Sequence, residues 1–302
     1  MDDLKRMAIF AAVVQQGSMS AAARQLGIST SAVSQQVRLL EQGGGVTLLH
    51  RSTRKLTLTD AGARYAEHCQ ALVAAAAQAR AQLTLAHDAP TGELRLSAPV
   101  GFARHVAPAL APLLAEYPTL SLKLLVDDAM IDLIDARVDL ALRAGRLADS
   151  SWTAQRLCAL EWALCAAPSY LQARGTPQSP SELAAHQWVA NPRSGAAFEF
   201  SLTGPEAQTQ ALRIEPRITS NNQLSLQQLC SAGLGLGLMV RTDVEPELRS
   251  GSLVSLLPGW RPPPIDVWAV TPQRDRQPAK VRRAIEALVA HFRSAAGAVA
   301  LE

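Results

Sequence analysis

The chain has 302 residues, a length that indicates two domains, and 48% of them are apolar, too large a share for a disordered chain. The formal net charge is +3, and the whole excess lies in residues 1–60, which hold seven basic and four acidic side chains. The rest of the chain holds 22 of each sign. This asymmetry suggests a nucleic-acid or membrane contact near the N-terminus.

Several classes of protein are excluded early. No apolar run follows the basic residues at the start, and no stretch approaches 18 uncharged apolar residues, so we expect a cytoplasmic protein without a secretory signal or membrane span. Cys69, Cys158, Cys165 and Cys230 are typical of reduced thiols in a chain of this size. The six histidines never approach the spacing of metal ligands, and no nucleophile elbow or phosphate loop occurs. We therefore expect no metal, no cofactor and no enzymatic activity.

Residues 4–43 show helical periodicity in short pieces broken by turn residues. Apolar side chains at spacings of three and four give a first helix, which Gly17 stops (Leu4, Met7, Phe10, Ala11 and Val14). Ser18 is positioned to cap a second helix over residues 20–26. After Gly27, Ser29 is positioned to cap a third helix, whose buried side is predicted to hold Val33, Val37 and Leu40.

The opposite side of the third helix carries side chains that form hydrogen bonds or are cationic: Thr30, Ser31, Ser34, Gln35 and Arg38. Two helices joined by a tight glycine turn, with a polar outer face on the second, are typical of a helix-turn-helix that places this face in the major groove of DNA. A small helical bundle with a solvated face fits the spacing equally well. Ser18, Ser20 and Ser29 join this set as candidate DNA contacts.

Residues 48–59 favour DNA binding, because two short apolar pieces flank a basic, hydroxyl-rich tip. This pattern predicts a two-stranded wing with Arg51, Arg54 and Lys55 on phosphates or in the minor groove. Thr59 is then expected to cap a helix that begins at Asp60.

Eight motifs in the first sixty or so residues resemble the N-terminal domain of LysR-type transcriptional regulators. They are Met7-x-x-Phe10, residues 17–23 (GSMSAAA), residues 26–29 (LGIS), residues 32–37 (AVSQQV), Leu40-Glu41, Val46-x-Leu48-Leu49, Arg51-x-Thr53-Arg54 and residues 58–62 (LTDAG). The resemblance implies a winged helix-turn-helix, a long dimerising helix and a periplasmic-binding-protein-like domain that senses a small molecule. Gly43, Gly44 and Gly45 depart from the family pattern, and we expect a looser end of the third helix there.

Residues 60–86 form one helical pattern, about 40 Å long at 1.5 Å per residue. A seam of small and apolar residues spaced by four and three follows it (Leu72, Ala76, Ala79, Leu83 and Ala86). The alternative is a helix packed on its own domain, but a helix this long with few large apolar side chains is more simply explained by pairing with a second copy. By resemblance, dimers of dimers are expected.

After the break at Pro90 and Gly92, strands and helices alternate. The patterns predict strands over 94–98, 120–126 and 139–143 and helices over 103–116 and 130–136, an arrangement that implies a parallel sheet. By resemblance, the domains are 1–59, 60–89 and 90–302, and the last divides into subdomain I (90–164 and 265–302) and subdomain II (165–264). The fold class is therefore α+β and α/β, with a type 2 periplasmic-binding-protein-like domain after the linker helix.

The ligand is expected between the subdomains, near the carboxyl ends of strands. Backbone N–H groups between Ser97 and Phe102 are placed to hold an anion at a helix N-terminus. The candidate effector contacts are Ser97, Pro99, Val100, Gly101, Phe102, Arg143, Arg146, Arg193 and Asn221. The glycines at 233, 235 and 237 resemble a nucleotide loop, but their spacing is one residue short and they precede a strand, so a helix-to-strand turn is predicted.

The leading hypothesis is an effector-responsive transcription factor. Its partners would be a pseudo-palindromic site on double-stranded DNA, a small-molecule effector with an anion as the expected class, further copies of the chain and RNA polymerase. The alternatives are a regulator that senses redox state through its thiols, with Cys230 near Cys158 and Cys165, and a two-lobed α/β enzyme.

Overall fold

The computed structural model describes residues 2–51, 56–128, 132–147, 152–192, 197–272, 277–294 and 298–299. The chain forms two compact units, an N-terminal unit of residues 1–85 and a C-terminal unit of residues 86–302. Within the described ranges, no helix is long and apolar enough to cross a membrane.

Three helices build the core of the N-terminal unit: α1 (Asp2–Gln16), α2 (Met19–Leu26) and α3 (Thr30–Gly44). Phe10, Val33 and Val37 are fully buried, as the helical periodicity predicts, whereas Leu4 is 54% exposed and lies outside this core. Both predicted caps are confirmed, because the Ser18 and Ser29 hydroxyl oxygens accept from the third N–H beyond each serine.

The end of α3 differs from the expectation. Helical geometry continues through Gly43 and Gly44 and stops only at Gly45, which adopts a left-handed conformation with φ of +64°. The N–H groups of Gly45 and Val46 donate to the carbonyls of Gln42 and Glu41, so the last helical carbonyls are satisfied. The three glycines therefore supply a regular C-cap.

A short hairpin and a long helix complete the N-terminal unit. Strands β1 (Leu49–Arg51) and β2 (Leu56–Leu58) pair antiparallel, which confirms the predicted wing strands. Helix α4 (Asp60–Asp88) follows, with Thr59 as its cap: the Thr59 hydroxyl accepts from Gly62 N–H at 2.9 Å. Gly62 is required here, because a Cβ on it would overlap the carbonyl oxygen of Leu48. After Cys69, α4 buries no side chain in this chain.

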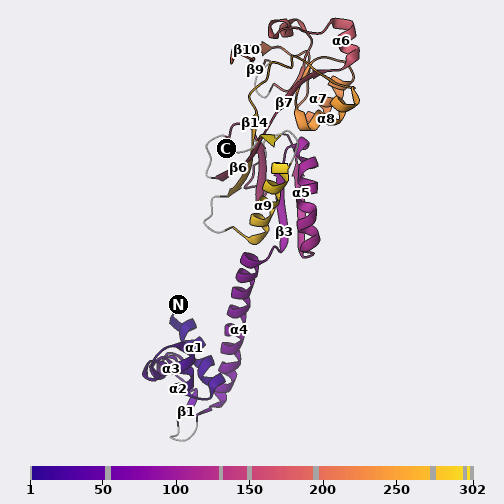
Figure 1. Ribbon diagram of the computed structural model, residues 1–302. Coiled ribbons are helices and arrows are strands. Elements are labelled where there is room, and N and C mark those ends of the chain that lie inside the picture. Colours follow the sequence, from indigo (N-terminus) through magenta and orange to yellow (C-terminus); the bar gives the residue numbers. More distant parts are fainter. Residues whose placement is uncertain are drawn as a thin grey trace. The chain divides into compact units, whose positions relative to one another are not determined.

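The C-terminal unit contains a large lobe, built on a six-stranded sheet (Figure 1). Its strand order is β15 (Ala298–Val299), β6 (Trp152–Leu160), β14 (Ile265–Pro272), β5 (Leu140–Ala144), β3 (Gly92–Ala98) and β4 (Leu120–Val126). The predicted strands pair parallel, β3 with β4 and with β5, whereas β14 runs antiparallel to β5 and β6. Helices α5 (Ala103–Glu116) and α9 (Ala279–Ser294) pack side by side on one face.

The helix predicted over residues 130–136 is wrong in its described part. Residues 133–137 form turns, and their backbone bonds are one of α-helical spacing, from Ala136 N–H to the Asp132 carbonyl, and two of other spacings, from the N–H groups of Arg137 and Val138. The Asp132 side chain accepts from Ile134 and Asp135 N–H, and Arg137 has a φ of +51°. One turn gains too few hydrogen bonds to offset the ordering of its residues, so Leu133 and Ala136 pack without forming a helix and Ile134 stays 70% exposed.

A small lobe holds the remaining elements. It contains a three-stranded sheet of β12 (Gly237–Val240), β7 (Trp162–Ala166) and β13 (Val254–Ser255), and the strand pairs β8 (Val189–Ala190) with β11 (Ile218–Thr219) and β9 (Phe198–Thr203) with β10 (Thr209–Ile214). Its helices are α6 (Pro168–Arg174), α7 (Gln223–Ser231) and α8 (Arg241–Ser250), with a 3₁₀ turn η2 (Pro180–Ala185).

The chain crosses between the lobes twice. It leaves the large sheet after Leu160 and enters the small one at Trp162, so the subdomain boundary expected at 164/165 falls inside β7. It returns with β14 at Ile265, the position that the resemblance implies. The glycines at 233–237 form the predicted helix-to-strand turn between α7 and β12.

Candidate functional site

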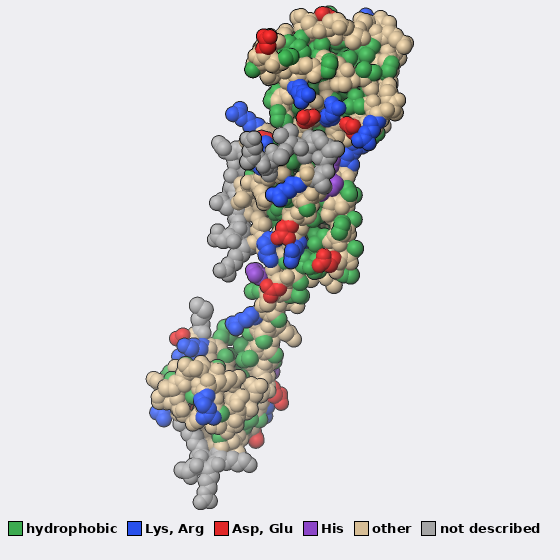
Figure 2. Space-filling model, in the orientation of Figure 1, with side chains coloured by type: hydrophobic (Ala, Val, Ile, Leu, Met, Phe, Trp, Pro, Cys, Tyr) green, Lys and Arg blue, Asp and Glu red, His purple; other side chains and the backbone are tan. Residues whose placement is uncertain are grey.

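The outer face of α3 presents the side chains that the sequence places there. Thr30, Ser31, Gln35 and Arg38 are exposed, and Ser34 is half-buried between them. The same helix buries Val33, Val37 and Leu40, so the hydrophobic core fixes which side of α3 faces outward. Much of the visible surface of the N-terminal unit is tan in Figure 2, the colour of the backbone and of side chains that are neither hydrophobic nor charged. Such a face can form hydrogen bonds with base edges without repelling phosphates.

Two of the candidate DNA-contacting residues, Ser29 and Ser18, also cap helices. The Ser29 hydroxyl oxygen accepts from Ala32 N–H at 3.1 Å and lies 2.9 Å from the Ser31 hydroxyl oxygen. The Ser18 oxygen accepts from Ala21 N–H at 3.4 Å. A hydroxyl that accepts with one lone pair can still donate its hydrogen, so capping does not prevent a bond to a phosphate. Ser20, in the first turn of α2, is exposed.

Glu41 anchors the start of the wing. Its Oε1 accepts from Leu48 N–H at 2.8 Å and from Leu49 N–H at 3.2 Å, so one carboxylate joins the C-terminal part of α3 to β1. Arg51 is the last residue of β1. Arg54 and Lys55 lie outside the described residues, and their predicted contacts stay predictions.

Ser97 and Arg143 meet at the carboxyl ends of β3 and β5. Arg143 Nη1 donates to the Ser97 hydroxyl oxygen at 3.3 Å and to the Leu142 carbonyl at 3.0 Å, and Ser97 is 2% exposed. Burial lowers the pKa of the Arg143 guanidinium. Within the described ranges, the bonds and ion pairs of Arg143 include no carboxylate. Trp268, opposite Arg143 in the β14–β5 register, was not anticipated from the sequence.

The loop after β3 differs from its expected role. Val100 N–H, predicted to hold a ligand anion, donates to Asp128 Oδ1 at 2.8 Å, and Phe102 N–H donates to the Pro99 carbonyl at 3.0 Å. The Phe102 side chain packs in the large-lobe core against Phe292. The sequence did not predict this bond, because Asp128, which accepts from Val100, is 28 residues further along the chain.

The other candidate effector residues are scattered. Gly101 lies against Asp243, where a Cβ would come within 2.9 Å of the carboxylate. Arg146 and Asn221 are exposed, and Asn222, not Asn221, caps α7 by accepting from Ser225 N–H. Arg193 lies outside the described residues.

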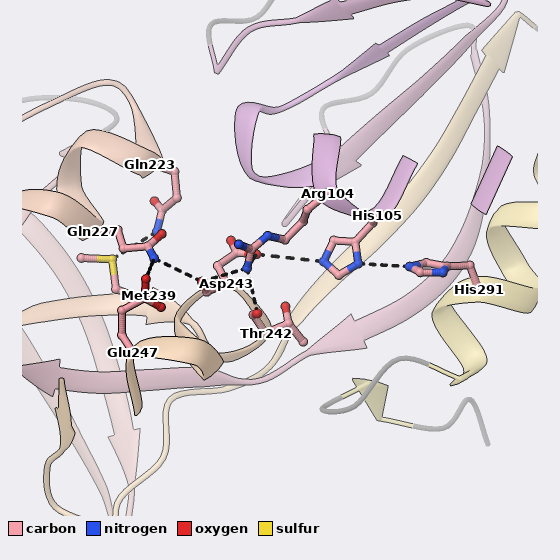
Figure 3. Close-up of polar contacts among 9 residues, drawn as sticks. All are labelled: Arg104, His105, Gln223, Gln227, Met239, Thr242, Asp243, Glu247 and His291. Carbon is pink, nitrogen blue, oxygen red and sulfur yellow. Dashed lines mark hydrogen bonds and ion pairs between the residues drawn. The ribbon is translucent and has the colours of Figure 1, made fainter. Parts of the chain in front are cut away.

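The sequence did not predict the buried polar cluster that lies where α5 meets α8 (Figure 3). Arg104 Nη1 donates to the carbonyls of Thr242 and Asp243 at 3.0 and 2.8 Å, which joins the two lobes. His105 Nδ1 lies 3.3 Å from His291 Nε2, and its Nε2 lies 4.0 Å from Asp243 Oδ1. Basic and acidic side chains also gather on the surface at this level of the C-terminal unit (Figure 2).

The environment of this cluster shifts the pKa values of Asp243 and His105 in opposite directions. Burial raises the pKa of Asp243 to about 6, with Arg104 acting to lower it and Asp128 to raise it further. Burial, followed by the charges of His291 and Arg104, lowers the pKa of His105 to about 4. Both residues are buried. A desolvated site favours the neutral form of an acid and of a base alike.

A cavity of about 730 Å³ lies at the crossings between the lobes, lined by Trp162, Arg241, Trp260 and Arg261 among others. None of the candidate effector residues that the structure describes lines it. The pocket and the predicted effector contacts are therefore separate features of the C-terminal unit.

The four cysteines are buried thiols. Cys230 does lie near Cys165, since its thiol donates to the Cys165 carbonyl at 3.6 Å, but Cys158 belongs to the large-lobe core. Burial raises the pKa of Cys158 to about 12. Because the thiolate is the form that reacts with oxidants, these environments favour structural thiols over redox sensors.

Comparison with protein families agrees with this architecture. Residues 4–63 match the model of the bacterial regulatory helix-turn-helix protein, lysR family, and residues 87–293 match the LysR substrate binding domain. The chain belongs to the LysR family of transcriptional regulators. This LysR-type regulator binds DNA through its N-terminal helix-turn-helix and carries an effector-binding domain. Its family consists of transcriptional regulators, so the alternative of a two-lobed α/β enzyme is wrong.

Relatives span nearly the whole LysR-type regulator. The HTH-type transcriptional activator AaeR of Escherichia coli strain K12 is 37% identical over 296 residues, which cover 97% of this chain and 94% of AaeR. The full-length Vibrio cholerae virulence activator AphB superposes with a TM-score of 0.70 at 28% identity, covering 95% of this chain and 99% of AphB. CrgA from Neisseria meningitidis superposes with a TM-score of 0.54 at 32% identity, covering 95% and 96% of the two chains.

Proposed function

We propose that this LysR-type regulator binds a pseudo-palindromic promoter site as a homodimer or homotetramer, with α3 of each copy in the major groove. The observation that carries the proposal is the outer face of α3, where hydroxyl, amide and guanidinium groups face away from a fixed apolar core. A two-fold symmetric pair of such helices fits two half-sites about one helical turn apart.

Base reading by Ser34 and Gln35 is tested by substitution. Ser34→Ala or Gln35→Ala should reduce the difference in binding free energy between the promoter site and a scrambled site by roughly 1–3 kcal/mol for each well-formed base contact that is lost. Arg38→Ala should instead weaken binding to both sites. If the guanidinium contacts a phosphate, the slope of log K against log salt concentration should also become shallower by about one. Gln70→Ala, an exposed glutamine on α4, is the control. A footprint that is absent or insensitive to salt would sink the proposal.

Helix α4 is the proposed dimerisation element. Leu83 is 74% exposed on the predicted seam, although a large apolar side chain gains by burial. Leu83→Glu should dissociate the oligomer in sedimentation velocity, because it places a charge in the paired seam. Ala81→Glu places the same charge on the opposite side of the helix and should leave the oligomer intact. Equal effects of both substitutions would argue against pairing through this seam.

We further propose an anionic effector held at the carboxyl ends of β3 and β5. The Arg143 guanidinium is half-buried and bonded only to neutral oxygens among the described residues, so a carboxylate there would gain a desolvated partner. A thermal-shift screen with small organic and aromatic carboxylates should find ligands that stabilise the wild type but not Arg143→Ala. Arg174→Ala, at the exposed end of α6, should bind them normally. A hit that stabilises Arg143→Ala as strongly as the wild type would place the ligand elsewhere.

A further inference from the structure

Asp128 bonds to both lobes of the C-terminal unit. It follows β4 in the large lobe, and its Oδ1 accepts from Val100 N–H at 2.8 Å, at the start of the 3₁₀ turn η1 (Val100–Phe102) that leads into α5. Its Oδ2 accepts from Gln223 N–H at 3.1 Å, in the first turn of α7 in the small lobe. One carboxylate therefore joins the beginnings of two helices from different lobes.

The two N–H groups are donors that a free anion would use. Helix beginnings present N–H groups without intrahelical acceptors and carry partial positive charge, so they favour a carboxylate. Val100 was itself predicted to hold the effector anion, and the chain's own carboxylate holds its N–H instead. Arg143, whose described bonds include no carboxylate, stands at the same carboxyl edge of the sheet, at the end of β5.

Other contacts hold the lobes together when Asp128 is released. Arg104 Nη1 spans the same junction to the carbonyls of Thr242 and Asp243. Asp128 also lies close enough to Asp243 to raise the pKa of that buried carboxyl, so its negative charge acts against a second one nearby. Exchange of Asp128 for another carboxylate would keep a negative charge at this position, and Arg104 would keep the lobes connected.

We propose that Asp128 is a latch between the lobes, occupying in the free protein the position that the carboxylate of an anionic effector takes over. This inference rests on the proposed effector class and adds a gating residue to that site. Effector binding then exchanges one carboxylate for another at Val100 and Gln223, and it frees Asp128 from both lobes.

Chemical rescue tests the latch without knowledge of the effector. Asp128→Ala removes the carboxylate and leaves both N–H groups without an acceptor, and we expect the melting temperature of the C-terminal unit to fall by about 4–8 °C in the full-length protein. Formate or acetate should then restore much of this loss, whereas sodium chloride at the same ionic strength should not. All five tryptophans lie in residues 152–268, so their fluorescence reports this unit alone.

Asp132→Ala is the matched control. Asp132 also accepts from two backbone N–H groups, those of Ile134 and Asp135, but within one turn of the large lobe. The Asp132→Ala variant should be less stable than the wild type, and formate should not restore its melting temperature. Asp128→Asn, which keeps one acceptor oxygen, should fall between the wild type and Asp128→Ala.

Formate that stabilises Asp128→Ala, and has less effect on both the wild type and Asp132→Ala, supports the latch. An equal effect on all three proteins, or no effect on Asp128→Ala, overturns it. The experiment uses neither DNA nor effector, so a negative result leaves the footprint and the Arg143 comparison to decide the proposed function separately.

Discussion

The buried pair of Asp243 and His105 leads to a prediction about stability and pH. The pKa of Asp243 is raised from 3.8 to about 6, so the folded state keeps a proton that the unfolded state has lost. Its contribution to stability is present below pH 4 and is lost as the pH rises through 6. The pKa of His105 is lowered from 6.5 to about 4, so its contribution is present above pH 6.5 and is lost as the pH falls through 4.

The two effects oppose each other over the same pH range. Each displacement is a little over two pH units, equivalent to about 3 kcal/mol in the free energy of unfolding. The two side chains lie 4.0 Å apart and share Arg104 as a neighbour, so a double variant is needed to separate their contributions. From these two groups, the wild type should therefore show almost no net change in stability between pH 4 and 6.5.

Single substitutions should reveal how each side chain alone makes the stability depend on pH. Asp243→Asn leaves His105 and should lose about 3 kcal/mol of stability between pH 6.5 and 4, whereas His105→Gln leaves Asp243 and should gain about as much. The double variant should again be nearly independent of pH. Urea unfolding followed by tryptophan fluorescence at each pH measures this directly. Slopes of the same sign in both single variants would refute the reasoning.

Three further predictions concern packing. Gly62→Ala should destabilise the N-terminal unit by about 1–3 kcal/mol in thermal circular dichroism, because its Cβ overlaps the Leu48 carbonyl oxygen. Gly43→Ala, whose Cβ meets nothing within 4 Å in the last turn of α3, should be neutral or stabilising by up to about 1 kcal/mol, and an equal loss in both variants would contradict this account. Glu41→Ala should weaken DNA binding through a loosened wing, with a loss of about 1–3 kcal/mol in stability, and unchanged affinity would show that the wing does not depend on this anchor. The four buried thiols should react with a disulfide reagent at least about tenfold more slowly in the native than in the unfolded chain, and rapid native labelling would revive the redox alternative.

Local signals predicted the N-terminal unit well. A cap such as Ser29 acts on an N–H three residues away, and the apolar spacing of Val33 and Val37 already states which side of the helix is buried. The same reasoning failed at residues 130–136, where seven residues cannot distinguish a helix from a packed turn.

Contacts between distant segments could not be predicted in this way. The partner of Val100 is 28 residues away, that of Gln223 is 95 residues away, and His105 meets His291 across 186 residues. Ser97 and Arg143 were chosen correctly as neighbours because parallel strands align their carboxyl ends, a rule of topology that needs only the strand order. No comparable rule brings Asp128 or Asp243 to the junction of the lobes.

The late return of the chain to the large sheet also affects the order in which the protein is synthesised and folds. Strand β14, which lies between β5 and β6, starts at residue 265, whereas the N-terminal unit is complete by residue 85. On the ribosome, the DNA-binding part can therefore fold before the large sheet has its central strand. A product truncated before residue 265 would keep the helix-turn-helix but lack a complete sensor, so frameshifts shortly before codon 265 should uncouple DNA binding from effector control.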